Sequence, residues 1–544
     1  MKELITKLLN IVIFVFIFSG SYSQQELSGI KAIRLSDLES YVSFLASPLL
    51  KGRMNGGEGL ELATNFIATE AKLIGLKPAN NGSYFQQFTV LQKSYDSLKT
   101  IIQISDQGKS PVNLKKPFYQ LIPTGVFEME LEGEVVFAGY GINSDKYNYY
   151  DLDSISIRDK IIMIMNGAPI PDNLDNSAFA EPMWKTVNGL YSKLSTLLNL
   201  QAKAILVVMD PKSGTESIAE FDSGLSEYLK TSIYLKGNAQ QVLLFPGNTR
   251  VIYIHREVAD ALLSGSGHSL EELQRSIDSS LKPQSFLIEN KQLKITSVVK
   301  TEEKVLKNVA GIIEGSDPVL KKEILVFSAH ADHMGISEDG RIFAGADDNA
   351  TGCSALLELA HAFSDLKKKP LRSILFLWVS GEEIGLFGSE SYVNNPLFPL
   401  ANTVADINLD MIGRTKSRAD TSDANPMTGP ETVFVISDDQ SSELNKIAAE
   451  VDKKSILIYD YSLSDKNNPL NIFERSDQYI FVQKNIPILL FTTGLHTTYH
   501  TPDDTVEKID FKKLELITKD VFKIGFIIAN NRKRIVVDNP FSSW

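Results

Sequence analysis

The fold is decided by residues 324–413, which open with the run ILVFSAHADH at residues 324–333. This run is apolar for the length of a strand and then ends in side chains that can bind metal or transfer protons. Two later runs end in the same way, FLWVSGEE at residues 376–383 and INLDMIG at residues 407–413. An open parallel sheet delivers functional side chains to its carboxyl edge in this manner. The pattern predicts an α/β sheet with a site at one edge.

The composition is that of a globular chain with room for more than one domain. Its 544 residues are too many for a single core. An apolar fraction of 43% with 22% charged residues excludes a disordered chain. The net charge of −12 and the lack of a basic stripe with interleaved aromatic side chains argue against a nucleic-acid partner. The single cysteine, Cys353, excludes an internal disulfide.

The first 23 residues have the three-part layout of a secretory signal peptide. A basic segment precedes an apolar run at residues 8–18, and small residues lie before a cleavage point at Gln24. The apolar run is shorter than the roughly 20 residues that a membrane-spanning helix needs. We therefore expect export to the periplasm or the medium, with no stable membrane insertion after cleavage.

Apolar periodicity predicts the order of the elements. Helices are expected at 35–45, 60–73, 190–200, 350–366 and 511–530, and strands at 84–91, 100–104, 133–141, 159–167, 204–210, 286–299, 305–315 and 486–491. Ser36 and Glu39 have the spacing of a capping box at the start of the first helix.

In the middle of the chain, short buried-strand runs alternate with helical segments, and this change of pattern predicts a separate module. The buried strands there do not end in clusters of acids or histidines, so this module is expected to be non-catalytic. We divide the chain into a signal peptide at 1–23, an N-terminal part of the catalytic domain at 24–125, an inserted module at 126–285 and the main catalytic domain at 286–544.

Acids and histidines near several strand ends indicate a metal centre. The candidate ligands are His330, Asp348, Glu383, Asp410 and His500. Imidazole and carboxylate ligands without a thiolate suit zinc or a related divalent ion. Two imidazoles and three carboxylates are too many for one tetrahedral zinc. They suit two ions about 4 Å apart with one bridging carboxylate.

Two neighbouring acids complete this set. Glu382 and Glu383 are adjacent at a strand end and point in opposite directions, so one can bind metal while the other acts as general base. Asp332 lies on the same side of an extended chain as His330 and can accept the second proton of that imidazole. His333 lies near the site without an assigned role.

Taken together, these motifs resemble those of the M28 family of zinc peptidases. The matching motifs are His330-x-Asp332, Asp347-Asp348-Asn349-x-Thr-Gly352, Glu382-Glu383, Asn408-x-Asp410 and His500-Thr-Pro. The resemblance implies a doubly wound, mixed and mostly parallel sheet with helices on both faces. It implies peptide substrates and two zinc ions on the five candidate ligands, with Asp348 bridging. It further implies Glu382 as general base, Asp332 as an orienting group and Tyr499 as an oxyanion-stabilising group.

The resemblance extends beyond the site. Residues 47–53 and 72–78 look like the N-terminal part of bacterial members, and the middle module looks like the protease-associated domain often inserted in this family. The resemblance also implies a cis peptide bond between Asp348 and Asn349. Gln478 departs from the family pattern, because many members have histidine there, and this departure affects a substrate contact rather than the metal ligands.

The expected activity is that of an aminopeptidase, and three alternatives stay open. A carboxypeptidase uses the same scaffold, as does a glutaminyl cyclase, which binds one zinc. Some relatives are binding receptors that have lost metal ligands, although no ligand position is missing from this sequence. The preferred substrate residue and the oligomeric state are not predicted.

Overall fold

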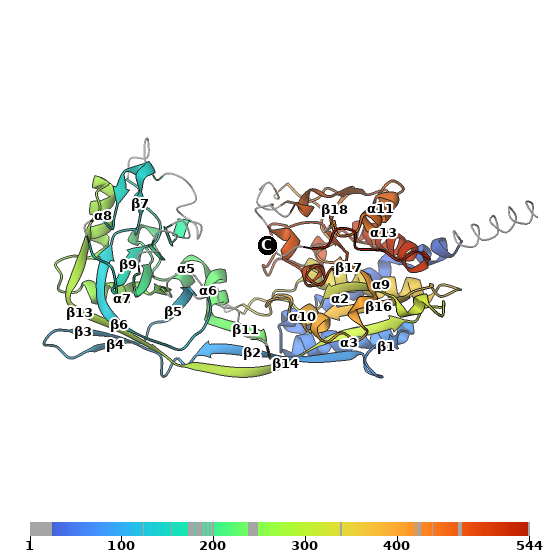
Figure 1. The fold of residues 1–544 in the computed structure, drawn as a ribbon, viewed down its shortest axis with the longest axis horizontal. Coiled ribbons are helices and arrows are strands. Elements are labelled where there is room, and N and C mark those ends of the chain that lie inside the picture. Colours follow the sequence, from blue (N-terminus) through green and yellow to red (C-terminus); the bar gives the residue numbers. More distant parts are fainter. Residues whose placement is uncertain are drawn as a thin grey trace, which may run out of the picture. The chain divides into compact units, whose positions relative to one another are not determined.

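The computed structural model shows two compact units (Figure 1). Unit 1 contains Met1–Val90 and Lys304–Trp544, and unit 2 contains Leu91–Glu303. The structure describes residues 24–122, 124–153, 155–171, 179, 189–190, 193–194, 197–198, 201–237, 249–337, 340–418, 420, 426–437, 439–465 and 471–541. The expected signal peptide and most of the helix expected at 190–200 therefore lie outside the described residues.

The boundary between the units differs from the expected one. It falls within strands β2 (Phe85–Tyr95) and β14 (Val299–Ile313), so unit 2 is wider than the module expected at 126–285. The reason is strand pairing: β13 (Ser285–Ser297) pairs with β3 (Ile101–Asp106) and with β6 (Met129–Ala138). The strands on both flanks of the expected module thus belong to its sheet.

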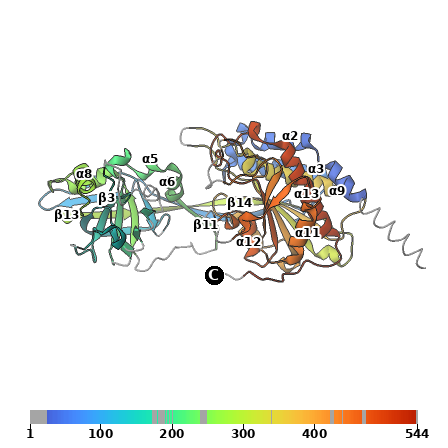
Figure 2. The same ribbon diagram turned by 90° about the horizontal axis from the view of Figure 1, so that it is seen from above.

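Unit 1 is built on a twisted, mostly parallel sheet (Figure 2). Its central strands are β15 (Ile324–His330), β16 (Ser373–Val379), β17 (Thr403–Leu409) and β20 (Ile488–Thr492). Each of these is buried along its whole length, as expected for a sheet covered on both faces. Adjacent members of the order β16-β15-β17-β20 are parallel. β14 joins antiparallel to β16, and β18 (Thr432–Ser437) joins antiparallel to β20 and parallel to β19 (Ile458–Asp460).

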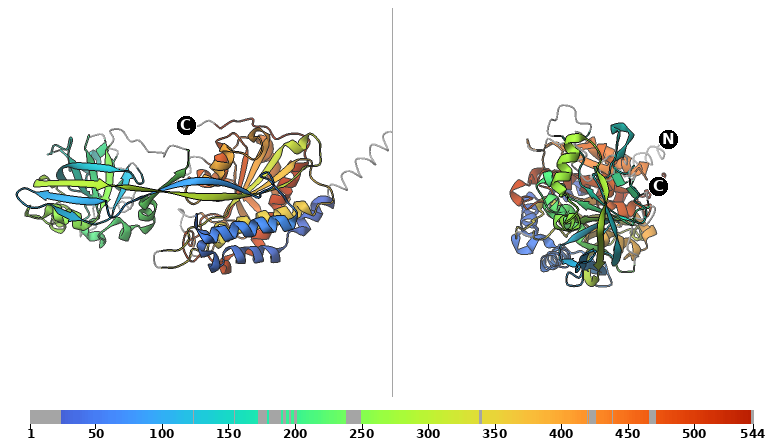
Figure 3. Two further views of the ribbon diagram at one scale, coloured as in Figure 1. Left: turned by 90° about the horizontal axis from the view of Figure 1, so that it is seen from below. Right: turned by 90° about the vertical axis from the view of Figure 1, so that its left-hand side faces the viewer.

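Helices cover both faces of this sheet, so the doubly wound α/β architecture is confirmed. One face packs against α2 (Leu35–Leu45), α3 (Glu58–Ile74), α9 (Gly352–Ser364), α11 (Ser442–Asp452) and α13 (Phe511–Asn530). The other face packs against α10 (Phe387–Asn394) and α12 (Gln478–Val482). The left view of Figure 3 shows the blue N-terminal helices lying along one face of the sheet.

Unit 2 has its own sheet, in the order β4-β3-β13-β6-β9-β10-β12-β5. The inner strands β6, β9 (Ile161–Met165), β10 (Ala204–Val208) and β12 (Arg250–Ile254) are parallel. The outer strands β4 (Val112–Leu114) and β5 (Phe118–Ile122) join antiparallel. α7 (Arg256–Leu263) and α8 (Leu270–Ser280) pack on one face.

Helix ends agree with the sequence in part. α3 ends at Gly75, which has a φ of 94° as a C-cap glycine should. α2 has the expected bounds, but the capping box predicted for it is wrong, because the N-cap is Arg34, two residues before Ser36, and it makes no side-chain cap. Among the described residues, the helices are too short or too polar to span a bilayer.

Candidate metal centre

Three parallel strands of unit 1 end level with one another. In the ladder between β15 and β16, His330 lies opposite Val379, and in the ladder between β15 and β17, Ser328 lies opposite Asn408. The residues that follow these strands therefore meet at one edge of the sheet. The loop after β20 returns to the same edge.

His330 is the centre of the first group of ligand atoms. Its Nε2 lies 3.2 Å from Asp410 Oδ1 and 3.2 Å from Asp348 Oδ1. Glu382 also belongs to this group, because one ligand atom each of His330, Glu382 and Asp410 lie within 4.8 Å of one another. The distances allow Glu382 to act either as a ligand or as a base.

His500 is the centre of the second group. Its Nε2 lies 3.1 Å from Asp348 Oδ2 and 3.0 Å from Glu383 Oε2. His333 joins this group through its Nδ1, which is 2.6 Å from Glu383 Oε1. Asp348 thus turns one carboxylate oxygen toward each group, as a bridging ligand would.

The structure brings all five candidate ligands together. It adds His333, which was predicted to lie near the site without an assigned role, because nothing in its spacing distinguishes it from a loop histidine. The peptide bond between Asp348 and Asn349 is cis, as the resemblance implied. Cys353 is a buried core residue whose Sγ donates to the His330 carbonyl oxygen.

The electrostatics of the cluster are those of a site built for cations. Burial alone would lower the pKa of His500, yet Glu383 and Asp348 raise it to about 10. Burial would raise the pKa of Glu383, and Asp348 adds to that effect, but His500 and His333 bring it down to about 2. Burial would also raise the pKa of Asp348, but the nearby histidines outweigh it and hold this pKa well below the usual range. Glu383 and Asp348 are therefore held as anions.

Glu382 behaves differently from these ligands. Burial raises its pKa well above the usual value, and the opposing charge of His330 does not cancel this effect. A carboxyl group with a raised pKa can accept a proton and return it during a reaction near neutral pH. The environments of the two adjacent glutamates thus push their pKa values in opposite directions.

Asp332 takes a position different from the predicted one. Its Oδ1 is 3.9 Å from Nδ1 of His330, and that nitrogen lies closer to the Asp332 carbonyl oxygen, at 3.3 Å. The carboxylate instead accepts the backbone N–H groups of Glu382 at 3.3 Å and Glu383 at 3.2 Å. The chain leaves the strand conformation after His330, so the side chain turns toward the glutamate pair. Asp332 therefore orients these two residues.

Two residues near the N-terminus support the site, and their contacts with it were not predicted from the sequence. Asn55 donates from Nδ2 to Asp332 Oδ2 at 2.7 Å. Arg53 is 1% exposed and donates to the carbonyl oxygens of Leu45, Ala331, Ala344, Gly345 and Asp348. Arg53 therefore links the loop after β15 to the segment that carries Asp348.

Asp504 holds the same segment from the other side. Its carboxylate accepts the backbone N–H of Asp347 at 3.0 Å and that of Asp348 at 3.1 Å. His496 lies next to this segment and outside the two groups of ligand atoms, with its Nε2 3.5 Å from Asp347 Oδ2. These contacts fix the backbone of Asp348 without competing for its carboxylate.

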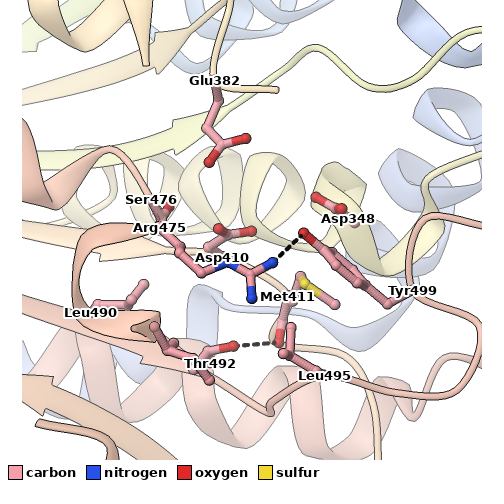
Figure 4. Close-up of a pocket in the computed structure, with 11 residues that line it drawn as sticks. Asp348, Glu382, Asp410, Met411, Arg475, Ser476, Leu490, Thr492, Leu495 and Tyr499 are labelled. Carbon is pink, nitrogen blue, oxygen red and sulfur yellow. Dashed lines mark hydrogen bonds between the residues drawn. The ribbon is translucent and has the colours of Figure 1, made fainter. Parts of the chain in front are cut away.

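A pocket opens beside both groups (Figure 4). Asp348, Glu382 and Asp410 line one side of it, and its apolar lining comes from Met411, Ile472, Leu490 and Leu495. Tyr499 and Arg475 also line the pocket. Burial and the nearby acids Asp348 and Glu383 raise the pKa of Tyr499 well above the usual value. Gln478 is buried and donates to the Phe473 carbonyl oxygen.

Comparison with known proteins points to one peptidase family. Residues 308–524 match the model for peptidase family M28. The chain is 27% identical over 228 residues to aminopeptidase YwaD of Bacillus subtilis, covering 40% of this chain and 44% of that protein. It is 37% identical over 100 residues to leupeptin-inactivating enzyme 1 of Streptomyces exfoliatus, covering 18% of this chain and 21% of that protein. These matches span less than half of either relative.

Solved structures share the fold over nearly the whole chain. An aminopeptidase from Aneurinibacillus sp. strain AM-1 superimposes with a TM-score of 0.52 at 18% identity, covering 94% of this chain and 98% of that one. The zinc aminopeptidase BSAP from Bacillus subtilis gives a TM-score of 0.50 at 18% identity, covering 93% of this chain and 98% of that one. At this level of identity the likeness establishes the fold.

Proposed function

We propose that this chain, whose residues 308–524 match the model for peptidase family M28, is a zinc-dependent aminopeptidase. The observation that carries the proposal is the position of Asp348 between two groups of imidazole and carboxylate ligands beside a pocket. The donor set contains no thiolate and is rich in carboxylate, which suits zinc in a hydrolytic site. The residues present therefore fit the metal.

The ligand atoms would divide between two ions. His330 and Asp410 would hold the first, His500 and Glu383 would hold the second, and Asp348 would bridge them. His333 orients Glu383, because with Nδ1 protonated it donates to Oε1. When bound, zinc supplies Lewis-acid activation of water and of the peptide carbonyl.

The side chains of the pocket supply the proton transfers. Glu382 takes a proton from the attacking water and returns it to the leaving amine. Asp332 holds Glu382 in place through its backbone N–H. Tyr499 donates a hydrogen bond to the carbonyl oxygen as negative charge develops there. The acids that line the pocket attract the free amino group of a peptide, which makes the N-terminal bond the one that is cut.

The test is metal content combined with hydrolysis of aminoacyl-p-nitroanilides. Purified protein is expected to contain two zinc ions per chain and to release p-nitroaniline until a chelator removes the metal. Zinc restores the release. Zinc-bound protein that cleaves none of these substrates contradicts the proposal.

A second candidate function, that of a carboxypeptidase, is favoured by one observation. Arg475 is the cation among the described residues that line the pocket, and a guanidinium binds a terminal carboxylate well. Peptides with a blocked N-terminus separate the two activities. An aminopeptidase leaves them intact, whereas a carboxypeptidase shortens them from the other end.

We also propose that the protein is exported and loses residues 1–23. The basic and apolar pattern of this segment is the support. N-terminal sequencing of protein recovered from the periplasm or the medium is expected to begin at Gln24. Recovery of the uncleaved chain from the cytoplasm alone would refute export.

A further inference from the structure

Arg475 reaches into the pocket from the turn that follows η11 (Ile472–Glu474). Its Nη2 atom lies 3.2 Å from Tyr499 Oη, and its guanidinium carbon Cζ lies 5.8 Å from the centre of the tyrosine ring. Figure 4 shows this hydrogen bond at the side of the pocket where Asp348 and Asp410 also lie. The guanidinium thus contacts the phenol group directly.

The direction of this hydrogen bond is fixed by chemistry. A guanidinium group has only donors, so the phenol oxygen must accept. The hydroxyl hydrogen of Tyr499 cannot point back to Arg475 and must be donated to another group. The pocket lies in front of it, because Tyr499 lines the same cavity as Glu382 and Asp410.

The ring itself has little freedom to turn away. Tyr499 stacks on His500 with ring centres 3.8 Å apart and an angle of 24° between the planes. The His500 ring and the Arg475 guanidinium therefore hold the phenol group from two sides. A bound peptide presents its carbonyl oxygen as an acceptor for this hydroxyl.

We propose that Arg475 is a positioning residue that makes Tyr499 a hydrogen-bond donor to the scissile carbonyl oxygen. The inference rests on the proposed peptidase function. It assigns Arg475 to the transition state through Tyr499 and not to the binding of a substrate carboxylate. The loss of Arg475 should therefore lower kcat, and should do so equally for peptides with acidic, neutral and basic N-terminal residues.

A double-mutant cycle tests this inference on the metal-loaded, full-length protein. Tyr499→Phe is expected to lower kcat by about a hundredfold, the effect of losing one oxyanion donor. Arg475→Met keeps the apolar stem and is expected to lower kcat about tenfold with KM little changed, as one lost charged hydrogen bond would. Adding Arg475→Met to Tyr499→Phe should change kcat by less than about twofold, because the two residues act through one bond. Arg475→Lys should restore part of the lost rate.

The controls separate this role from a general structural one. Arg532→Met removes an arginine whose side chain is 81% exposed and lies 3.8 Å from Asp317, and it should leave kcat unchanged. Zinc content and melting temperature should match wild type in all variants.

Three results would overturn the inference. Multiplicative effects of the two single changes would show that they act independently. A loss confined to acidic substrates or to KM would show a direct contact with substrate. A wild-type protein that hydrolyses no peptide would overturn the proposed function together with this inference. An active wild type in which the two substitutions have multiplicative effects on kcat would overturn the inference alone.

Discussion

Glu382 and Glu383 are neighbours in the chain, yet their surroundings differ in a way that separates their roles. His333 and His500 contact the Glu383 carboxylate and lower its pKa to about 2, against the effect of burial. Burial raises the pKa of Glu382. Because Glu382 lies in the same group as His330 and Asp410, distance alone does not decide between a ligand and a base.

The variant Glu382→Gln decides between these roles. We expect it to keep two zinc ions and to lower kcat by about a thousandfold, because the amide coordinates nothing essential and cannot accept the proton. Metal analysis and steady-state kinetics measure the two effects. Glu383→Gln is the matched control and should lose zinc. If Glu382→Gln loses zinc as readily, Glu382 is a ligand and the proposed base must be sought elsewhere.

The residues of the site were predictable to different degrees. The five candidate ligands stood out because each follows an apolar run of strand length or occupies a motif resembling the family. Asn55 and Arg475 did not stand out, because each is an ordinary polar residue in a loop, and Arg53 stood out only as part of the segment 47–53, without a role. Asn55 meets Asp332 across 277 positions of sequence, and only the folded chain reveals such a partner.

At the scale of elements, the turn η1 (Pro48–Arg53) connects α2 to the metal centre. Arg53 ends this turn and satisfies five backbone carbonyl groups while buried. A lysine at this position has three donors on one atom and cannot reach carbonyl groups on three segments. The remaining carbonyl groups would be buried without donors.

We therefore expect Arg53→Lys to lower the free energy of unfolding by about 3 kcal/mol, the cost of a few unsatisfied buried groups. Urea denaturation measures this loss, and zinc titration of the folded variant should show weaker binding. Lys51→Met is the control from the same turn. Its ion pair with Glu58 is exposed, with side chains 57% and 84% accessible, and surface pairs of this kind contribute little. Equal effects of the two variants would contradict the role of Arg53.

Glu358 links α9 to the start of α2. The residue is 1% exposed, and its carboxylate accepts the backbone N–H of Arg34 at 2.7 Å. Burial raises its pKa from 4.5 to about 7, although the Arg34 N–H opposes this. Between these two values the folded protein holds a proton that the unfolded chain releases. The stability contributed by Glu358 is therefore full below about pH 4.5 and is lost as the pH rises toward 7.

Glu358→Gln should remove this dependence. The amide oxygen still accepts from Arg34, so the variant should match wild type near pH 4.5 and exceed it by up to about 3 kcal/mol at pH 8. Unfolding free energies at the two pH values give the difference, and Glu39→Gln on the exposed side of α2 provides the comparison. A constant difference between Glu358→Gln and wild type at both pH values would show that Glu358 has no raised pKa.

Elements were easier to predict where one periodic pattern decides them. The helix expected at 511–530 is α13, with the same bounds, because its apolar stripe is long and uninterrupted. The helix expected at 60–73 begins earlier, at Glu58, and so contains Gly59, where a Cβ atom would come within 1.6 Å of the Leu50 carbonyl oxygen. Close packing of this kind has no local sequence signal.

At the scale of the whole molecule, the two units divide the chemistry unequally. Among the described residues, both groups of candidate ligands belong to unit 1, on loops after β15, β16, β17 and β20. The parallel strands of unit 2 carry no such groups at their ends in the described part of the chain. We retain the protease-associated identity of unit 2 as a proposal, which rests on its resemblance in sequence.

This division predicts how metal removal affects each unit. A ligand that binds only the folded state at a thousand times its dissociation constant stabilises by about 4 kcal/mol, and this gain belongs to the part of the chain that holds it. Chelation should therefore speed hydrogen exchange in peptides from the central strands of unit 1. Peptides from β9 and β10 of unit 2 serve as the internal control and should exchange at unchanged rates. Exchange is carried out on the full-length protein, which is then digested, and mass spectrometry measures deuterium uptake in the peptides of both units. Equal acceleration in the two units would show that the ions stabilise the chain as one cooperative body, and unchanged exchange in both would contradict a metal centre on these loops.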